Sequence, residues 1–496
     1  MKGKVVLIGA GPGSLDLLTL KGKEYISEAD CIVYDRLSSQ ELLLFARPDC
    51  RLIYAGKANH HHIMSQDAIN ATLLSESEKC NLVVRLKGGD PYVFGRGGEE
   101  ALFLRQHGVT VEVISGVTSA IAVLAAAGIP VTHRGLATGF QVITAHSKKD
   151  ALADINYRQL LDPNVTLVFL MGLAHVREIA AGLVAVGRAT DTPAAVISNG
   201  TTPQQKKCIG TLDNIGDMAE EAHLASPAII VVGKVVSLAS DLCVLEDKPL
   251  FGKKCLVPYI QGFDFDFYTK LSGDRDSRLA SLLREEGAQT SLVKIGRIEP
   301  VMADIDTLTA DFDWIIFTSP NAVSTYMYNL FLAGLDVRSM KAGKIAVVGD
   351  KTALYLKKFG LNANLIPDSQ TAKGLALKLA AIVNDDTRIL FPSASHTEGS
   401  LVKLLSGNCQ LTQVICYENK EEYGKVPEES DYDYIFFTSA SSVRRLAALL
   451  PSFDEKACIS IGPTTTAALQ EAGASNILEA SEPSYEAMIM IATNKT

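Results

Sequence analysis

The first half of the chain alternates short apolar runs with stretches of helical periodicity. Strand-like runs that end in turn residues or polar groups occupy residues 4–9, 31–35, 51–56, 81–90 and 110–116. A second series of such runs occupies residues 140–146, 166–172, 193–200 and 227–236. Continuous apolar strands separated by helices predict an α/β fold with a mostly parallel sheet that is buried on both faces.

This alternation is lost over residues 236–254 and resumes with the apolar run KCLVPYI at 254–260. We therefore expect a domain boundary near residue 247, which divides the chain into 1–247 and 248–496. A chain of 496 residues is long enough for two to four domains, each with a sizeable core.

The second half contains an internal repeat. Residues 313–326 are similar to 433–446, residues 344–360 are similar to 457–473, and the strings KCLVP and RILFPSAS form a third pair. Each unit is a strand, a turn with a hydroxyl or glycine, and then a helix, whose free N–H groups can hold an anion. The alternative is that each hydroxyl only caps its helix. The duplication predicts two similar α/β lobes facing a cleft, and the pattern alone favours lobes in tandem.

Composition narrows the class of protein. Apolar residues make up 47% and charged residues 21% of the chain, as in ordinary globular proteins. A net charge of −9 argues against a nucleic-acid-coating protein, although a local basic pocket stays possible. Nine cysteines without a CxxC motif indicate free thiols in a reducing compartment. With no signal peptide and no apolar run long enough for a bilayer, we expect a soluble cytoplasmic protein without a membrane partner.

The N-terminal string VVLIGAGPG is similar to a dinucleotide-binding turn, with an acid, Asp35, at the end of the next strand. The fingerprint G-x-G-x-x-G requires a third glycine where this chain has Ser14. Pro12 inside the turn has no N–H to donate to a pyrophosphate. A nicotinamide site is therefore an alternative that the sequence disfavours.

A second glycine turn follows the strand at 81–87, in the string KGGDPYVFGRGGEE. Glycines allow close approach of a ligand to the backbone, and the carboxylate of Asp90 can accept hydrogen bonds from a ribose or an amine. A nucleotide-like cofactor with a positive centre, such as S-adenosylmethionine, suits this site. The alternative is a plain turn in which Asp90 caps a helix.

These two glycine turns belong to a longer series of motifs. GAGPG, YDRL, AGK, KGGDPYVFGRGGEE, SGVTSA, GIPVTHRG, VFLMG and SNGT occur in this order over residues 1–245. Together they resemble the tetrapyrrole methylases and, within them, the uroporphyrinogen-III C-methyltransferases. The resemblance implies a two-lobed fold that binds S-adenosylmethionine between its lobes, and it also implies a homodimer. Ser14, Leu15 and Asp16 depart from the family's frequent Asp-Pro-Glu, and Ala58 replaces a frequent arginine, which puts one substrate contact in doubt.

Residue by residue, the resemblance assigns a cofactor role to Pro12, Gly88, Gly89, Asp90, Val93, Thr118, Ser119, Met171 and Gly200. It makes Asp35 the proton acceptor and Lys57 the proton donor of the reaction. A pyrrole carbon attacks the sulfonium methyl and the ring must then lose a proton, which a carboxylate can take. The alternative for Asp35 is that it only positions a pyrrole N–H.

The substrate of that family carries eight carboxylates, so cations near the motifs are candidate contacts. They are Arg36, Arg85, Lys87, Arg96 and Arg134, each of which is otherwise an ordinary surface charge. We favour Arg96, because it stands in the specific GRGGEE string. Adjacent His60, His61 and His62 do not have metal-ligand spacing, and we expect no metal. His62 matches a family histidine and is assigned to a substrate loop; His133 of the THRG string has a similar status.

The second half resembles the uroporphyrinogen-III synthases, in the strings FTSPNAV, VVGDKTA, VICYENK, FFTSASSV and IGPTTTAAL. This resemblance implies two α/β lobes joined by a two-stranded linker and no cofactor. Lobe one takes about 253–296 and 419–496, and lobe two about 297–418, which corrects the tandem arrangement. Tyr417 matches the tyrosine proposed to assist loss of the substrate hydroxyl; the alternative is a strand tyrosine packed at a lobe edge. Hydroxyls for the substrate carboxylates are assigned to Thr318, Ser319, Thr438, Ser439, Thr464 and Thr465.

The two resemblances imply a bifunctional enzyme that cyclises hydroxymethylbilane to uroporphyrinogen III and methylates the product twice to precorrin-2, for sirohaem or cobalamin. Three alternatives remain. They are a methylase of another tetrapyrrole, a nicotinamide oxidoreductase, and a methylase with a non-catalytic tetrapyrrole-binding C-terminal module.

Overall fold

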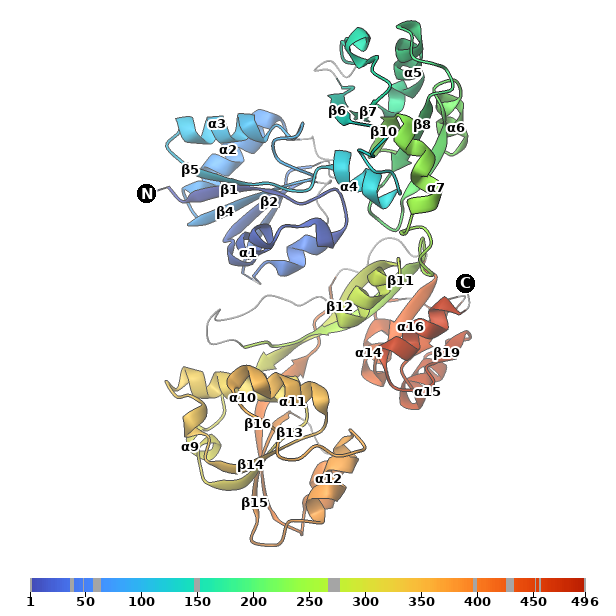
Figure 1. Cartoon of the computed structure of the whole chain (residues 1–496). Coiled ribbons are helices and arrows are strands. Elements are labelled where there is room, and N and C mark those ends of the chain that lie inside the picture. Colours follow the sequence, from blue (N-terminus) through green and yellow to red (C-terminus); the bar gives the residue numbers. More distant parts are fainter. Residues whose placement is uncertain are drawn as a thin grey trace.

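The computed structural model of the chain describes residues 2–35, 40–47, 49–56, 64–146, 152–265, 277–395, 399–424, 432–450, 452–454 and 456–494. These residues form three β-sheets with helices packed on both faces of each sheet (Figure 1). The α/β class that the apolar pattern predicts is therefore confirmed.

The first sheet is entirely parallel, as the sequence predicts, with the strand order β3-β2-β4-β1-β5. Its strands are β1 (Lys4–Gly9), β2 (Cys31–Tyr34), β3 (Arg51–Tyr54), β4 (Leu82–Lys87) and β5 (Thr110–Ile114). Helix α1 (Leu20–Glu28) covers one face, and α2 (Gln66–Ser77) and α3 (Gly97–Gln106) cover the other (Figure 1). Ile8 of β1 packs in one core with Ile26 of α1. Its neighbour Leu7 packs on the opposite face with Leu104 of α3, because side chains alternate along a strand.

The second sheet is mixed, so the expectation of a mostly parallel sheet is wrong here. Its strands are β6 (Gly139–Thr144), β7 (Val165–Leu170), β8 (Pro193–Ser198), β9 (Lys206–Thr211) and β10 (Ala228–Val232), in the order β6-β7-β10-β8-β9. Only β6 and β7 pair in parallel. Strand β10 enters between β7 and β8 and runs antiparallel to both, and the short loop after β8 returns the chain as antiparallel β9. The helices of this sheet are α4 (Ser119–Ala126), α5 (Val176–Ala185), α6 (Ile215–Glu221) and α7 (Ala239–Leu242).

The third sheet carries the internal repeat of the second half. Its strands are β11 (Lys254–Gln261), β12 (Gln289–Pro300), β13 (Phe312–Phe317), β14 (Ala342–Val347), β15 (Arg388–Ala394), β16 (Gln410–Lys420), β17 (Tyr434–Phe437), β18 (Ala457–Ser460) and β19 (Ile477–Glu479). The strand order is β14-β13-β15-β16-β12-β11-β17-β18-β19. The first four strands mirror the next four, and the mirrored pairs β13 with β17, β14 with β18, and β15 with β11 are the three repeats read from the sequence.

Two long strands connect the two ends of this sheet, which Figure 1 shows as separate lobes. Strands β12 and β16 pair antiparallel through Arg297–Pro300 and Tyr417–Lys420. One lobe holds α8 (Arg278–Glu285), α14 (Ala440–Ala447), α15 (Pro463–Glu471) and α16 (Tyr485–Thr493). The other holds α9 (Ile305–Leu308), α10 (Pro320–Leu332), α11 (Asp350–Leu356), α12 (Ala372–Ala380) and α13 (Ser400–Leu405). The chain thus leaves one lobe through β12 and returns to it through β16.

The glycines of the opening motif serve backbone packing. A Cβ at Gly9 would lie 2.5 Å from the Cα of Gly116 and 2.6 Å from the carbonyl oxygen of Gly89, so only glycine fits there. The amide of Gly11 donates to the carbonyl of Gly89 at 3.2 Å, and the amide of Gly89 donates back to Gly11 at 2.8 Å. The turn after β1 is therefore paired with the turn after β4, and these two amides are committed to backbone partners.

This packing gives a stability prediction. Gly9→Ala should lower the free energy of unfolding by about 1–3 kcal/mol, because the added methyl overlaps fixed backbone atoms. Gly98→Ala is the matched control: it adds a methyl with no atom within 4 Å at an exposed helical position. The control should leave stability unchanged or raise it by up to about 1 kcal/mol. Urea titration followed by circular dichroism measures both, and equal midpoints for the two variants would contradict the packing role.

Candidate functional site

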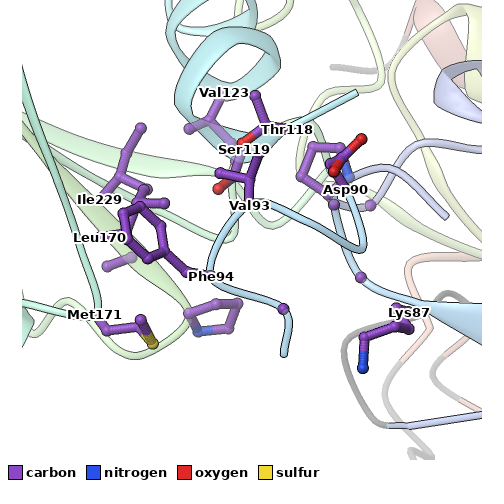
Figure 2. Close-up of a pocket in the computed structure, with 18 of the residues that line it drawn as sticks. Lys87, Asp90, Val93, Phe94, Thr118, Ser119, Val123, Leu170, Met171 and Ile229 are labelled. Carbon is purple, nitrogen blue, oxygen red and sulfur yellow. The ribbon is translucent and has the colours of Figure 1, made fainter. Parts of the chain in front are cut away.

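A cavity of about 760 Å³ opens between the first and second sheets. Its walls are the turn after β1, the loop after β4, the start of α4, and the ends of β7 and β8. Figure 2 shows Thr118, Ser119 and Val123 on one wall, with Leu170, Met171 and Ile229 on the other. Cavities of this size hold nucleotide-sized ligands.

The structure brings all the predicted cofactor residues together at this cavity. They are Pro12, Gly88, Gly89, Asp90, Val93, Thr118, Ser119, Met171 and Gly200. They come from five separate segments of the chain, so their convergence follows from the fold and not from their spacing. Their individual roles toward a ligand stay predictions.

The cavity wall holds four non-glycine residues in the left-handed backbone region. Phe94, Arg96, Met171 and Asn199 have φ angles of 53°, 58°, 57° and 48°. Such conformations are costly for side chains with a Cβ and concentrate at ligand sites, where the surrounding structure holds them in place. The loops around the cavity are therefore fixed in shape by the fold.

The carboxylate of Asp90 braces the loop after β4. Its Oδ2 accepts from the amide of Gly116 at 3.0 Å, and its Oδ1 accepts from the amide of Tyr92 at 2.8 Å. This turn-bracing role is close to the alternative interpretation of Asp90. Each carboxylate oxygen retains a further acceptor site, so a ligand contact is compatible with the brace.

A buried charged cluster lies at the other side of the loop after β4. The carboxylate of Glu100 in α3 is 0% exposed, and its Oε1 accepts from Lys87 Nζ at 2.8 Å and from Gln66 Nε2 at 3.1 Å. Arg85 is 3% exposed; its Nη2 donates to Asp35 Oδ2 at 3.1 Å, and its Nε lies 3.5 Å from Glu100 Oε1. Asp35, Gln66, Arg85 and Lys87 also line the cavity.

Lys87 has an unusual electrostatic setting. Burial lowers the pKa of the Lys87 amine, the nearby positive charge of Arg85 lowers it further, and Glu100 and Asp35 oppose the shift. Two cations and two carboxylates balance in this cluster, as buried ionic groups require. The predicted proton acceptor, Asp35, is therefore tied to a buried network through Arg85.

The other residues that the sequence predicts to bind the substrate do not all line this cavity. Arg96 lines the cavity and pairs with Glu99 at 2.7 Å, with both side chains largely exposed. Arg134 is exposed and is not among the described residues that line the cavity. Lys57 and His62 lie outside the described residues, as do Arg36, His60 and His61.

Sequence reasoning passed over Glu100 and Gln66. Glu100 stands in the GRGGEE string, from which only Arg96 was predicted to contact the substrate. A signal was present, since Glu100 is three residues after Gly97 and four before Leu104, both on the buried face of α3. An acid at a core position of a helix indicates a buried ion pair.

A second cavity, of about 470 Å³, lies in the second half of the chain. The predicted hydroxyl residues Thr438 and Ser439 line it from the start of α14, and Pro320 and Asn321 line it from the start of α10. Because α10 and α14 belong to different lobes, both lobes contribute to this cavity. The sequence did not single out four of its other polar lining residues: Asp264, Arg278, Tyr355 and Tyr485.

Tyr417 is buried within β16 and is not among the described residues that line this cavity. Its hydroxyl lies 3.2 Å from the Oγ of Ser319, the N-cap of α10. Burial raises the pKa of the Tyr417 phenol, and the hydrogen bond with Ser319 opposes the shift. The phenol thus stays protonated at neutral pH and can act as a hydrogen-bond donor.

The remaining predicted hydroxyl residues do not reach the lining of this cavity, as far as the described residues show. Ser319 only flanks it, next to Pro320, and Thr318 lies one residue further back. Thr464 is exposed and Thr465 is buried at the start of α15. Their assignment to the substrate stays a prediction that no contact here supports.

One contact between the lobes, and one contact of the segment after β11 with α11, lie beside the second cavity. Lys351 of α11 places its Nζ 4.6 Å from the ring centre of Tyr485 in α16. Asp264, just after β11, accepts from Tyr355 and from Lys358, whose Nζ lies 3.2 Å away. The cavity is thus closed on one side by α11 of one lobe against α16 of the other.

The described part of the chain contains no group of three or more His, Cys, Asp or Glu side chains placed to hold a metal ion. All nine cysteines are free thiols. Within the same described ranges, no helix is both long and apolar enough to cross a bilayer.

Comparison with known proteins matches each half of the chain to a different family. Residues 4–216 match the family Tetrapyrrole (Corrin/Porphyrin) Methylases, and residues 277–490 match the family Uroporphyrinogen-III synthase HemD. The chain is 36% identical over 459 residues to the porphyrin biosynthesis protein HemD of Ruminiclostridium josui, covering 90% of this chain and 88% of that protein.

Two further relatives match the first half. The uroporphyrinogen-III C-methyltransferase of Methanocaldococcus jannaschii is 47% identical, covering 48% of this chain and 98% of that protein. The S-adenosyl-L-methionine-dependent uroporphyrinogen III methyltransferase of Arabidopsis thaliana is 44% identical, covering 48% of this chain and 64% of that protein.

The chain is therefore an enzyme of tetrapyrrole biosynthesis, and its first half belongs to the tetrapyrrole methylases. Its second half belongs to the uroporphyrinogen-III synthases, so the chain joins a uroporphyrinogen-III C-methyltransferase to a uroporphyrinogen-III synthase.

The buried cluster gives a second stability prediction. Arg85→Met should lower the free energy of unfolding by about 3 kcal/mol, because Asp35 and the buried Glu100 lose a partner. The matched control is Arg96→Met, which removes a cavity-lining arginine whose ion pair is exposed; it should cost less than about 1 kcal/mol. Urea denaturation measures both, and an equal cost for the two variants would show that the Arg85 contacts do not stabilise the fold.

Proposed function

We propose that the second half of the chain cyclises hydroxymethylbilane to uroporphyrinogen III, and that the first half methylates this product twice with S-adenosylmethionine to give precorrin-2. The observation that carries the proposal is the convergence of nine predicted cofactor residues on one cavity, beside the ion pair of partly exposed Asp35 with buried Arg85. Precorrin-2 leads to sirohaem or to cobalamin, and the chain's own residues favour neither product.

The cavity fits S-adenosylmethionine. Gly89 has a φ of +66°, and a Cβ there would still lie 3.9 Å from the nearest atom outside its own turn, so the turn leaves room for a ligand against the backbone. When bound, S-adenosylmethionine supplies an electrophilic methyl group. Thr118, Ser119, Val93 and Met171 line the cavity walls and hold the methyl donor there by shape and hydroxyl contacts.

Asp35 is proposed as the proton acceptor. Arg85 holds one of its oxygens at 3.1 Å and so fixes the carboxylate at the cavity wall. Carbon–carbon bond formation at the pyrrole leaves an extra proton on the ring system, and a fixed carboxylate takes it. Lys57 is proposed as the proton donor on the family resemblance alone, and it lies outside the described residues.

The substrate carboxylates require cations. Arg96 is proposed as the main contact because it is exposed at the cavity mouth, where its guanidinium can bind a carboxylate with two parallel hydrogen bonds. His62 and Arg134 are proposed as further contacts from the resemblance.

In the second half, Tyr417 is proposed to assist departure of the terminal hydroxyl of hydroxymethylbilane. Its phenol is protonated and its oxygen is paired with Ser319 at the start of α10. Thr438 and Ser439 at the start of α14 face the cavity and are proposed to bind substrate carboxylates, with Thr318, Thr464 and Thr465 as further candidates. The reaction loses water and needs no cofactor, so the lobes act mainly by folding the flexible substrate.

We also propose a division of the chain at residues 247 and 248. Glu246 pairs with Lys207 of the first half at 2.9 Å, whereas Leu250 is buried in a core of the second half. A homodimer through the methylase half, in the cytoplasm, is proposed from the resemblance alone.

The main alternative is that the second half only binds a tetrapyrrole without acting on it. One assay tests both halves: the whole chain with hydroxymethylbilane and S-adenosylmethionine labelled at its methyl group. We expect uroporphyrinogen III and then a doubly labelled ring. Formation of only the spontaneous uroporphyrinogen I isomer would refute the synthase half, and absence of label from supplied uroporphyrinogen III would refute the methylase half.

Asp35→Asn tests the proton acceptor. We expect the rate of methyl transfer to fall roughly a hundredfold, because the amide cannot accept the proton, with S-adenosylmethionine affinity nearly unchanged. Asp16→Asn is the control, since it removes an exposed carboxylate from the same region. Labelled methyl transfer and calorimetry measure the two quantities; a variant at full rate would exclude Asp35 as the base.

Tyr417→Phe tests the synthase site. We expect the rate of isomer III formation to fall about tenfold, since the phenol no longer assists the leaving hydroxyl. Tyr434→Phe is the control: its hydroxyl is also buried, and it donates to the carbonyl of Ala492 away from the second cavity. The ratio of isomers I and III by chromatography measures both, and equal ratios for the two variants would leave Tyr417 a packing residue.

A further inference from the structure

The most deeply buried charge near the first cavity is one that the proposed reaction does not use. Glu100 is 0% exposed and sits in α3, behind the strand that carries Arg85 and Lys87. Its Oε1 accepts from Lys87 and Gln66 and lies near Arg85, whereas its Oε2 has no hydrogen-bond partner among the described residues. Burying a carboxylate costs several kcal/mol unless partners offset it, so Glu100 calls for an explanation.

The closest hydrogen-bond partner of Glu100 is Lys87, which lines the cavity. Lys87 ends β4, is 6% exposed, and lines the cavity together with Asp35 and Arg85. Figure 2 shows its side chain on the far side of the loop from Asp90, Thr118 and Ser119. Lys87 therefore lies apart from Thr118 and Ser119, although it directly precedes Gly88 of the proposed cofactor loop.

A lysine in this position can form an ion pair with a carboxylate of an acidic substrate only while its amine is protonated. Burial and the charge of Arg85 both lower the pKa of Lys87, and Glu100 is the first group that raises it, with Asp35 second. The other charged groups near the cluster are Arg96, Glu99 and Asp67. Arg96 pairs with Glu99 at the start of α3, and it also interacts with Glu100 and with Asp67 of α2.

We propose that Glu100 is a positioning residue for methyl transfer, which keeps the Lys87 ammonium charged and placed for a carboxylate of the tetrapyrrole substrate. Glu100 touches neither substrate nor methyl donor and acts through Lys87. The inference rests on the proposed methyltransferase function, and it adds a requirement that the family resemblance does not contain.

Glu100→Gln separates this role from a structural one. The amide keeps the shape and an acceptor oxygen but removes the negative charge, so the pKa of Lys87 falls further. We expect the KM for uroporphyrinogen III to rise about tenfold near neutral pH, with a smaller change in kcat. Above the lowered pKa of Lys87, kcat/KM should fall about tenfold for each pH unit, because a lysine is charged only below its pKa. The unaltered chain should keep its activity to a higher pH.

The matched control is Glu76→Gln in α2. Glu76 is also a buried carboxylate with two cationic partners, Lys79 at 2.9 Å and Arg51, but it does not line the cavity. The Glu76→Gln substitution should lower the free energy of unfolding without changing the pH profile of methyl transfer. Calorimetry with S-adenosylmethionine checks that each variant is folded, and we expect affinities within about twofold of the unaltered chain.

Two further variants test whether the charge of Glu100 acts through Lys87. Glu100→Asp retains the charge and should restore the unaltered pH profile even if its rate is low. In a Lys87→Met background, Glu100→Gln should have little further effect on KM, because its partner is gone. A Glu100→Gln profile parallel to that of the unaltered chain, or additive losses in the double variant, would overturn the proposal. Absence of methyl transfer by the unaltered chain would instead refute the proposed function itself.

Discussion

The first active-site cavity depends on the close approach of three backbone segments at the carboxyl ends of β1, β4 and β5. Gly9 and Gly116 meet there against the carbonyl of Gly89, with no space for a side chain on Gly9 or Gly116, and the turn after β1 pairs with the turn after β4. Parallel strands end at the same edge of a sheet, so three tight turns meet at one place. Everything that lines the cavity on this side is positioned by that contact, including the loop braced by Asp90 and the left-handed residues Phe94 and Arg96.

Charged groups are also buried close to this backbone contact. Strand β4 carries Arg85 and Lys87 into the interior, two residues apart and therefore on the same face of the strand. Glu100 in α3 covers that face and balances them, and Asp35 at the end of β2 completes the set. The cavity thus has one region shaped by backbone and small side chains and another shaped by buried charge. In the proposed function, the first region suits a nucleotide-like cofactor and the second suits an acidic ring.

Much of this could be predicted from the sequence, and the exceptions have physical reasons. Apolar runs located the strands, and the repeated strings identified the duplication in the third sheet. The repeats alone favoured lobes in tandem, which is wrong, because the chain leaves one lobe through β12 and returns to it through β16. The direction of β10 could not be predicted, because an apolar run fits a parallel or an antiparallel neighbour equally well. Gly9 and Gly116 mark a backbone contact that tolerates no side chain, and this contact brings the turns after β1 and β4 together at the cavity. By contrast, Thr464 and Thr465 follow the same turn-and-hydroxyl pattern as Thr438 and Ser439 yet are not among the described residues lining the second cavity. The N-cap of α15 is Gly462, so both threonines lie inside the helix, whereas Ser439 is the N-cap of α14.

The two halves use different physical means that suit their proposed reactions. Methyl transfer requires a donor and a carbon nucleophile to be aligned, and the first cavity has strained, fixed loops and a balanced buried cluster that resist movement. Ring closure requires a flexible chain with many carboxylates to be folded, and the second cavity lies between lobes joined by only two paired strands. Exposed ion pairs, such as Arg297 with Glu299 at 3.2 Å, accompany that connection and contribute little to its rigidity. The lobes also meet directly where Lys351 lies over Tyr485. Relative motion of the lobes is therefore least costly at β12 and β16, whereas the charge pairs beside the first cavity all lie within the first sheet and its helices and hold that wall together.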